Sequence, residues 1–153
     1  MKHILLLLLG LSSLPLLAQR SAVFEKSKCS MYLYNQDSTS LELMKSSFKA
    51  RKVETIVVEY QCHEEEVENI LNGETLYLVL VNTIGEIVLE GGPLITVGGT
   101  EIQTYTKAIY RSKKGIRFEV NPEEDFRWKK GESYMFFIYS GEGVVKRKVI
   151  LLN

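Results

Sequence analysis

The C-terminal stretch, residues 126–153, constrains the fold of this chain more than any other. It contains Tyr-Met-Phe-Phe-Ile-Tyr at 134–139, then Ser-Gly-Glu-Gly at 140–143, then Val-Val-Lys-Arg-Lys-Val-Ile-Leu-Leu at 144–152. The two outer runs are rich in aromatic and β-branched residues, and a tight glycine-containing turn separates them. Such an arrangement predicts a β-hairpin. The hairpin indicates a β-rich fold.

The β pattern continues through most of the chain. Further strands are expected where apolar or β-branched residues alternate or cluster between turn residues: 30–34, 53–61, 75–81, 86–90, 101–111 and 116–120. Residues 75–81 are almost all apolar, which is typical of a central strand buried on both faces. Residues 91–99 contain four glycines and predict an irregular crossover. Residues 41–48 fit a strand or a helical turn, and their context favours a strand.

One short helix is expected at residues 63–71. Three consecutive glutamates at 64–66 complement the positive end of a helix, and the apolar residues 67, 70 and 71 have helical spacing. Asn72 and Gly73 supply a C-terminal stop. About eight short strands with one connecting helix predict an all-β fold, an antiparallel β-sandwich. A small closed barrel has the same strand count and alternation and remains the alternative.

The N-terminus, residues 1–18, has the features of a secretory signal peptide. Lys2 is followed by an apolar run, and Ala18 is a small residue at a suitable cleavage point. A membrane anchor is the alternative, but a span needs about 20 apolar residues, and polar residues and a proline interrupt this segment. We therefore expect a single domain at 19–153 with no membrane span after cleavage. The expected location is secreted or periplasmic, in a Gram-negative-type envelope, or at the cell surface.

The charge of the mature chain excludes some partners. The whole sequence has 19 basic and 19 acidic residues, and removing Lys2 leaves 18 basic against the same 19 acidic. A nearly neutral protein has no bulk attraction for nucleic acid or acidic lipid. Basic clusters such as 146–148 alternate along predicted strands, which is typical of a solvated strand edge.

Two cysteines remain in the exported chain, Cys29 and Cys62. An even number in an oxidising compartment favours one disulfide. Cys29 precedes the first strand and Cys62 ends the strand at 53–61, so antiparallel pairing would bring the two sulfurs together. Two buried free thiols are the alternative.

The pattern Trp128-x-x-Gly131-x-x-Tyr134-x-Phe136-x-Ile138 resembles the entry to the penultimate strand of immunoglobulin-like and fibronectin type III-like domains of exported proteins. That resemblance implies a tyrosine corner, in which Tyr134 hydrogen-bonds to upstream backbone and Trp128 packs beneath the turn. Antibody-type domains carry a cysteine where this chain has Phe136, so their inter-sheet disulfide is absent here.

A second resemblance covers residues 76–153. The order of strand, Asn-Thr-Ile-Gly turn, strand, aromatic strand, glycine turn and basic strand looks like the C-terminal sorting domains of the type IX secretion system. This resemblance implies that the C-terminal half directs export across an outer membrane.

No catalytic constellation is present in the sequence. His63 is the only histidine after signal cleavage, and the glutamates beside it point about 100° apart on a helix, so they cannot converge on one ion. No nucleophile elbow, phosphate loop or dinucleotide fingerprint occurs. We therefore expect no enzyme and no cofactor. The predicted function is a non-catalytic protein-binding or assembly module of the envelope, whose partner is another envelope or surface protein.

A carbohydrate- or ligand-binding module is the alternative function. Five aromatic residues could form a stacking platform or a protein contact: Tyr105, Tyr110, Phe137, Tyr139 and Trp128. Filling of the core is the competing interpretation of most of them. Coplanar rings on one exposed face would favour sugar, whereas a broad apolar patch or an open strand edge would favour a protein.

Overall fold

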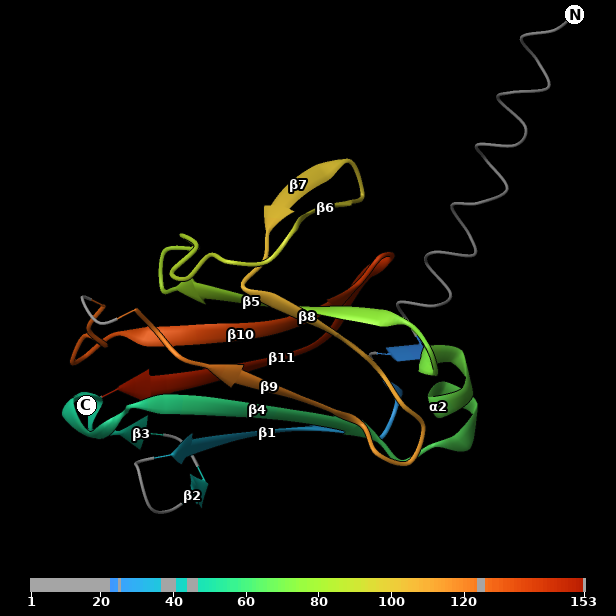
Figure 1. Cartoon of the computed structure of the whole chain (residues 1–153), viewed down its shortest axis with the longest axis horizontal. Helices are drawn as coiled ribbons and strands as arrows, with labels where there is room; N and C mark the ends of the chain where they lie inside the picture. Colours follow the sequence, from blue (N-terminus) through green and yellow to red (C-terminus); the bar gives the residue numbers. More distant parts are fainter. Residues whose placement is uncertain (1–22, 25, 37–40, 44–46, 124–125, 153) are drawn as a thin grey trace, which may run out of the picture.

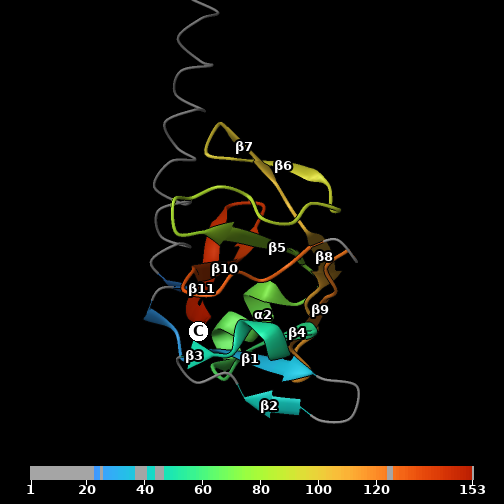
Figure 2. The same cartoon turned by 90° about the vertical axis from the view of Figure 1, so that its left-hand side faces the viewer.

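The structure is a computed structural model that describes residues 23–24, 26–36, 41–43, 47–123 and 126–152. It is mostly β, with antiparallel sheets and one short helix, α2 (Glu65–Leu71). The signal peptide predicted at 1–18 lies outside the described residues. Figure 1 shows the two larger sheets with α2 at one end, and Figure 2 shows the molecule from the opposite end.

The predicted C-terminal hairpin forms the centre of a five-stranded sheet. Strand β10 (Ser133–Ser140) pairs antiparallel with β11 (Gly143–Leu152), and on its other side with β5 (Thr75–Asn82). The order is β3-β11-β10-β5-β8, with β3 (Ser47–Phe48) parallel to β11 and β8 (Thr106–Ile109) at the opposite edge. The hairpin prediction is therefore confirmed.

The four-stranded sheet has the order β2-β1-β4-β9 and is antiparallel throughout. Strand β1 (Cys29–Gln36) pairs along its whole length with β4 (Thr55–Cys62). The short β2 (Leu41–Leu43) and β9 (Ile116–Val120) flank this pair. Residues 41–48 therefore contribute strand at both ends, β2 and β3, while 44–46 lie outside the described residues.

Side chains from both sheets fill a single core. Along β10 and β9, buried and more exposed residues alternate, as expected for strands with one face toward a core. The shared core includes Leu33 and Val58 from the four-stranded sheet, and Leu78 and Phe136 from the five-stranded sheet. Helix α2 adds its apolar side at one end, where Val67 and Leu71 are buried.

Helix α2 begins and ends close to the predicted bounds. Glu64 occupies the N-cap position, and the acidic residues of the first turn complement the helix dipole. After the C-cap Asn72, Gly73 has a φ of 86°. Its amide donates to the carbonyl of Tyr110. The predicted Asn72–Gly73 stop is confirmed, because the left-handed conformation that ends the helix suits glycine.

Two strand predictions in the middle of the chain are wrong. Residues 86–90 form no strand and contribute only an isolated bridge between Ile87 and Val81. The strand expected at 101–111 is divided into β7 (Thr100–Gln103) and β8, which belong to different sheets. The division occurs at Thr104, whose buried hydroxyl donates to the carbonyl of Pro93 at 2.6 Å.

The crossover predicted at 91–99 contains a strand, β6 (Leu94–Val97), which pairs with β7 as a two-stranded hairpin. Figure 1 shows this hairpin projecting from the side of the molecule that carries β5. Alternation in the sequence could not reveal the division between β7 and β8 at Thr104, because the alternating pattern continues from one strand into the other. The described residues form more strands than the eight expected, since β2, β3, β6 and β7 each have four residues or fewer.

Candidate functional site

Tyr134 and Trp128 form the corner that the sequence predicted at the entry to β10. The backbone amide of Lys129 donates to the Tyr134 hydroxyl at 3.0 Å, and that hydroxyl donates to Glu132 at 3.2 Å. The indole ring of Trp128 lies edge-on to the Tyr134 ring, with 5.0 Å between ring centroids, and edge-on to Phe126. Gly131, with a φ of 82°, makes the turn between them. The corner therefore stabilises the loop and is an element of the fold.

Burial also affects the chemistry of this corner. It raises the pKa of Tyr134, while the Lys129 amide that donates to the phenolic oxygen opposes the shift. The indole Nε1 of Trp128 is buried without a hydrogen-bond partner among the described residues. A buried donor without a partner is uncommon in folded proteins.

The structure joins Cys29 and Cys62 in a disulfide, as predicted. The two residues are direct partners in the β1–β4 register, and their Cα atoms are 3.9 Å apart. Both are buried. The Tyr60 hydroxyl lies 2.9 Å from the Cys62 sulfur, and the Ser27 hydroxyl lies 2.9 Å from that of Cys29. Polar groups therefore contact the bond on both sides.

The prediction of Tyr110 as a surface residue is wrong, because its side chain is 0% exposed. Its hydroxyl accepts the backbone amide of Cys62 at 3.1 Å, and its ring packs edge-on against Tyr60. Burial raises the pKa of both tyrosines. Tyr110 continues the alternation of β8, in which Thr106 and Ala108 are more buried than Lys107 and Ile109, so its side chain lies on the core side.

Tyr105 is half-buried and connects two loops. Its hydroxyl donates to the carbonyl of Asn121 at 3.1 Å and accepts the amide of the same residue at 3.0 Å. It lines an open cavity of about 830 Å³ together with Phe126 and Arg127. Because its polar group is already bonded to the backbone, Tyr105 serves mainly to hold the 121–123 segment in place.

Phe137 and Tyr139 lie together on the outer face of the five-stranded sheet. Their ring centroids are 6.0 Å apart and the rings are tilted by 37°. In the register of β10 with β5, Phe137 is opposite Val79 and Tyr139 is opposite Tyr77. The structure therefore brings these two predicted residues together, but Tyr105 and Tyr110 lie elsewhere.

We call the surface around them the outer face. It consists of the side chains that β5, β8, β10 and β11 direct away from the core, as their burial and register define them: Thr75, Tyr77, Val79, Val81, Lys107, Ile109, Ser133, Met135, Phe137, Tyr139, Val144, Arg147, Val149 and Leu151. Ile109 is 52% exposed and Val149 is 51% exposed. Most members are apolar, and several are well exposed.

The charges of the outer face are all of one sign. Lys107 and Arg147 are its only charged members, and both are exposed. Neither forms a salt bridge with another described residue. An apolar surface with isolated cations and no carboxylate is electrostatically complementary to an apolar surface that carries acids.

The opposite face, on the four-stranded sheet, has a different character. Tyr32 is 42% exposed and its ring lies 6.5 Å from that of Tyr34, tilted by 41°. Both tyrosines line a shallow groove of about 320 Å³ that also contains Glu59 and Arg117. Arg117 forms salt bridges with Glu59 at 3.3 Å and Glu119 at 3.4 Å. The charges on this face are therefore balanced.

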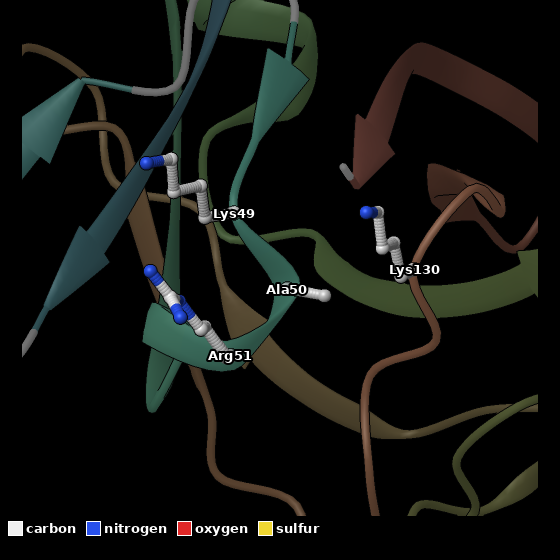
Figure 3. Close-up of a pocket in the computed structure, with 4 residues that line it drawn as sticks. All are labelled: Lys49, Ala50, Arg51 and Lys130. Atoms are coloured by element: carbon white, nitrogen blue, oxygen red, sulfur yellow. The ribbon is translucent and has the colours of Figure 1, made fainter.

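A basic hollow of about 480 Å³ lies beside the 3₁₀ helix η1 (Ala50–Lys52) and is lined by Lys49, Ala50, Arg51 and Lys130. Figure 3 shows that Lys49 and Arg51 extend away from Lys130, while the Ala50 methyl group points toward it. The three cations do not converge on a common point. We therefore do not assign an anion site to this hollow.

The described residues contain no group of three or more histidine, cysteine, aspartate or glutamate side chains placed to hold a metal ion. Within the same residues, no helix has the length and apolar character needed to cross a bilayer. Comparison with protein-family models, with curated proteins and with solved structures finds no match.

Sequence reasoning missed most of the outer face. The signal was present in β11, where apolar residues occupy both sides of the strand. Val145, Ile150 and Leu152 are buried, and Val144, Val149 and Leu151 are exposed. A strand with one solvated face normally carries polar residues on that side.

Proposed function

We propose that the chain is an exported, non-catalytic β-sandwich of the immunoglobulin-like class that binds another protein of the cell envelope. The outer face carries this proposal. Its exposed apolar side chains on β11, Val144, Val149 and Leu151, lie beside half-buried apolar and aromatic side chains of β10. Its only charges are the cations Lys107 and Arg147. Contiguous exposed apolar surface is typical of protein-interaction sites.

The strand order supports the immunoglobulin-like class. In such domains the first, second and fifth strands share one sheet, and the third, sixth and seventh share the other. Here β1, β4 and β9 pair in that order, and β5, β10 and β11 pair in the second sheet with β8 beside β5. The position of Tyr134 on β10 agrees with this assignment. One departure is that no described strand pairs with the outer edge of β9.

The partner we propose is a protein whose contact surface is apolar and carries carboxylates. The cations supply the argument, because burying Lys107 and Arg147 without an opposite charge would cost the complex several kcal/mol, about 2–5 for a fully buried charge. Tyr77, Phe137 and Tyr139 would supply the rigid aromatic contacts that interface hot spots favour.

Site-specific photo-crosslinking in the native host tests the proposal. A benzoylphenylalanine at position 137 should give a protein adduct, identified by mass spectrometry. The same group at position 32, on the opposite sheet, and at position 84, in an exposed turn, provides matched controls. The absence of a protein adduct at 137, or equal adducts at all three positions, would contradict the proposal.

A carbohydrate-binding function is the second candidate, and the groove beside Tyr32 and Tyr34 favours it. The tilt between the two rings is unfavourable for stacking both on one flat sugar chain. Titration with neutral oligosaccharides, compared between the wild type and Tyr32→Ala, distinguishes this function. Saccharide binding that Tyr32→Ala abolishes would favour it over the protein-binding proposal.

Export and sorting stay proposals with direct tests. Fractionation should place the protein outside the cytoplasm with residues 1–18 removed, and an intact N-terminus in the cytoplasm would overturn the export proposal. For the sorting alternative, residues 76–153 fused to an exported reporter should carry it past the outer membrane. Retention of that reporter in the periplasm would count against it.

A further inference from the structure

Strand β11 has an open backbone edge next to the outer face. The amide of Leu152 donates to the carbonyl of Glu132, and the carbonyl of Leu152 accepts from the amide of Gly131. Both backbone groups of Leu152 therefore face the β10 side. Since residues along an antiparallel strand alternate in direction, those of Ile150 and Lys148 also face β10, and those of Leu151, Val149 and Arg147 face away.

In the part of the chain that the structure describes, only the end of this edge has a partner strand. Strand β3 pairs in parallel with β11 at Leu151 and Leu152. Among the described residues, no partner is seen for the outward amide and carbonyl groups of Val149 and Arg147. Within the described ranges, the edge from residue 143 to 149 therefore has no partner strand, and β3 shows that β11 accepts a strand along the adjoining Leu151 and Leu152.

The side chains along the edge determine which kind of added strand can bind. Residues 146–148 are Lys, Arg and Lys. Lys148 donates to the carbonyl of Met31 at 3.4 Å, which connects β11 with β1. Lys146 and Arg147 form no salt bridge with a described residue. Basic residues commonly protect an edge from pairing. Here exposed Val144 and Val149 flank them, which weakens such protection against an acidic strand.

We infer that β11 accepts an extended, acidic segment of the partner protein as an added strand along residues 143–149. Main-chain hydrogen bonds to Arg147 and Val149 would provide the pairing, and a carboxylate opposite Arg147 would set the register. Arg147 and Val149 lie on the same face of β11, so an apolar side chain two residues from that carboxylate would contact Val149. This inference rests on the proposed protein-binding function and specifies how the partner binds.

A synthetic nine-residue peptide of valine and glutamate, in which one face of the extended chain carries both residue types two positions apart, serves as the probe for the full mature chain. We expect the peptide to bind and to slow amide hydrogen exchange at Arg147 and Val149 at least tenfold, with no change at Ile109 on the opposite edge strand. A lysine-for-glutamate peptide should bind at least tenfold more weakly. The acidic peptide with every amide N-methylated should not bind, because neither of its edges can then donate main-chain hydrogen bonds.

Two variants and a control sharpen the test. Arg147→Glu should weaken binding of the acidic peptide at least tenfold, while Lys114→Glu, an identical charge change in a turn on another edge, should alter it less than twofold. Val149→Pro removes an outward amide but none that pairs with β10, so it should abolish binding with the far-ultraviolet circular dichroism unchanged. If Val149→Pro unfolds the protein, the slowing of amide exchange at Arg147 and Val149 in the wild type tests the inference instead.

The inference is overturned if the peptide does not slow exchange at Arg147 and Val149. It is also overturned if the N-methylated or lysine peptides bind as well as the acidic one, because charge or apolar contact alone would then explain binding. A protein crosslink at position 137 together with failure of the peptide would leave the proposed function intact and refute strand addition alone. Failure of the crosslink with peptide binding intact would refute the proposed function instead.

Discussion

Removal of the Cys29–Cys62 disulfide should destabilise the protein by about 4–5 kcal/mol. The perturbation is the double substitution Cys29→Ala and Cys62→Ala, which removes the cross-link without leaving a free thiol. The cysteines are separated by 33 residues in sequence. The chain-entropy relation for a loop of that length gives about 3.7 kcal/mol of stabilisation through the unfolded state.

The surroundings of the bond add a second contribution. Tyr60 is buried, and its hydroxyl lies 2.9 Å from the Cys62 sulfur. Loss of this sulfur leaves a buried hydroxyl without that partner, which costs about 1 kcal/mol. The backbone pairing of Cys29 with Cys62 should persist, because β1 and β4 continue their register as far as Gln36 and Thr55. The two contributions give the total stated above.

Urea denaturation followed by tryptophan fluorescence and by circular dichroism measures this change. The oxidised wild type, the reduced wild type and the double variant are compared. Reduction removes the disulfide bond but keeps the sulfurs, whereas the double variant loses both. Tyr60→Phe with the disulfide intact measures the hydroxyl contribution alone. A destabilisation below about 1 kcal/mol in the double variant would refute the reasoning from loop closure, as would free thiols at both positions in the protein purified from an oxidising compartment.

Three further predictions concern the core and its turns. Tyr134→Phe should lower the free energy of unfolding by about 1–2 kcal/mol, since it removes the hydrogen bonds to Lys129 and Glu132. Trp128→Ala should lower it by about 2–4 kcal/mol, because the indole ring is only partly buried. Urea denaturation, with the exposed Lys130→Ala as control, tests both values. Gly115→Ala should lower the free energy of unfolding by about 1–3 kcal/mol, because Gly115 has a φ of 67° and a Cβ there would meet the carbonyl of Tyr60 at 2.5 Å. Gly141→Ala should have almost no effect, because a Cβ there would meet nothing within 4 Å. Equal effects of the two substitutions in thermal melts would contradict this prediction. The contribution of the buried tyrosines to stability should be constant below about pH 10, the pKa of unfolded tyrosine, and should fall as the pH rises further. Burial raises the pKa of Tyr60, Tyr110 and Tyr134, so that unfolded tyrosines ionise first, and a Tyr60→Phe variant that shows an unchanged alkaline transition would argue against Tyr60 as a contributor.

The sequence predicted those parts of the fold that depend on local pattern. The hairpin of β10 and β11, the strand β4 and the helix α2 each have a dense apolar pattern and a clear turn or stop beside them. The disulfide followed from the same information, because antiparallel pairing of two recognisable strands places Cys29 opposite Cys62. Such features need no knowledge of distant contacts.

The errors occurred where distant contacts override local pattern. Thr104 and Tyr105 interrupt an alternating stretch, because the Thr104 hydroxyl bonds to Pro93 and the Tyr105 amide bonds to the carbonyl of Leu78. Tyr110 is buried with its hydroxyl satisfied, because the backbone amide of Cys62, 48 residues earlier, donates to it. Neither partner can be identified from the residues next to Thr104 or Tyr110 in the chain.

Apart from Phe137 and Tyr139, which were predicted as possible contact residues, the outer face was missed for a related reason. An apolar residue in a strand predicts burial, but the sequence does not say on which face a second layer lies. In β10, Phe136 faces the core and Phe137 faces away, although both are apolar and adjacent. Only the pairing of β10 with β5 and β11 shows that Phe137 shares its side with exposed Val149 and not with the core.

The two sheet faces differ in a way that assigns the interaction to one of them. On the four-stranded sheet, Arg117 is already neutralised by Glu59 and Glu119, so a charged partner would gain little there. On the five-stranded sheet, Arg147 has no described counter-ion and lies between exposed apolar residues at an open strand edge. A partner that brings a carboxylate gains the ion pair and the apolar contact at the same place. The outward backbone groups of Arg147 also have no partner among the described residues, so the carboxylate of the binding partner need not come from a folded surface. An extended acidic segment can satisfy the side chain and the backbone of Arg147 together, which a flat surface cannot do.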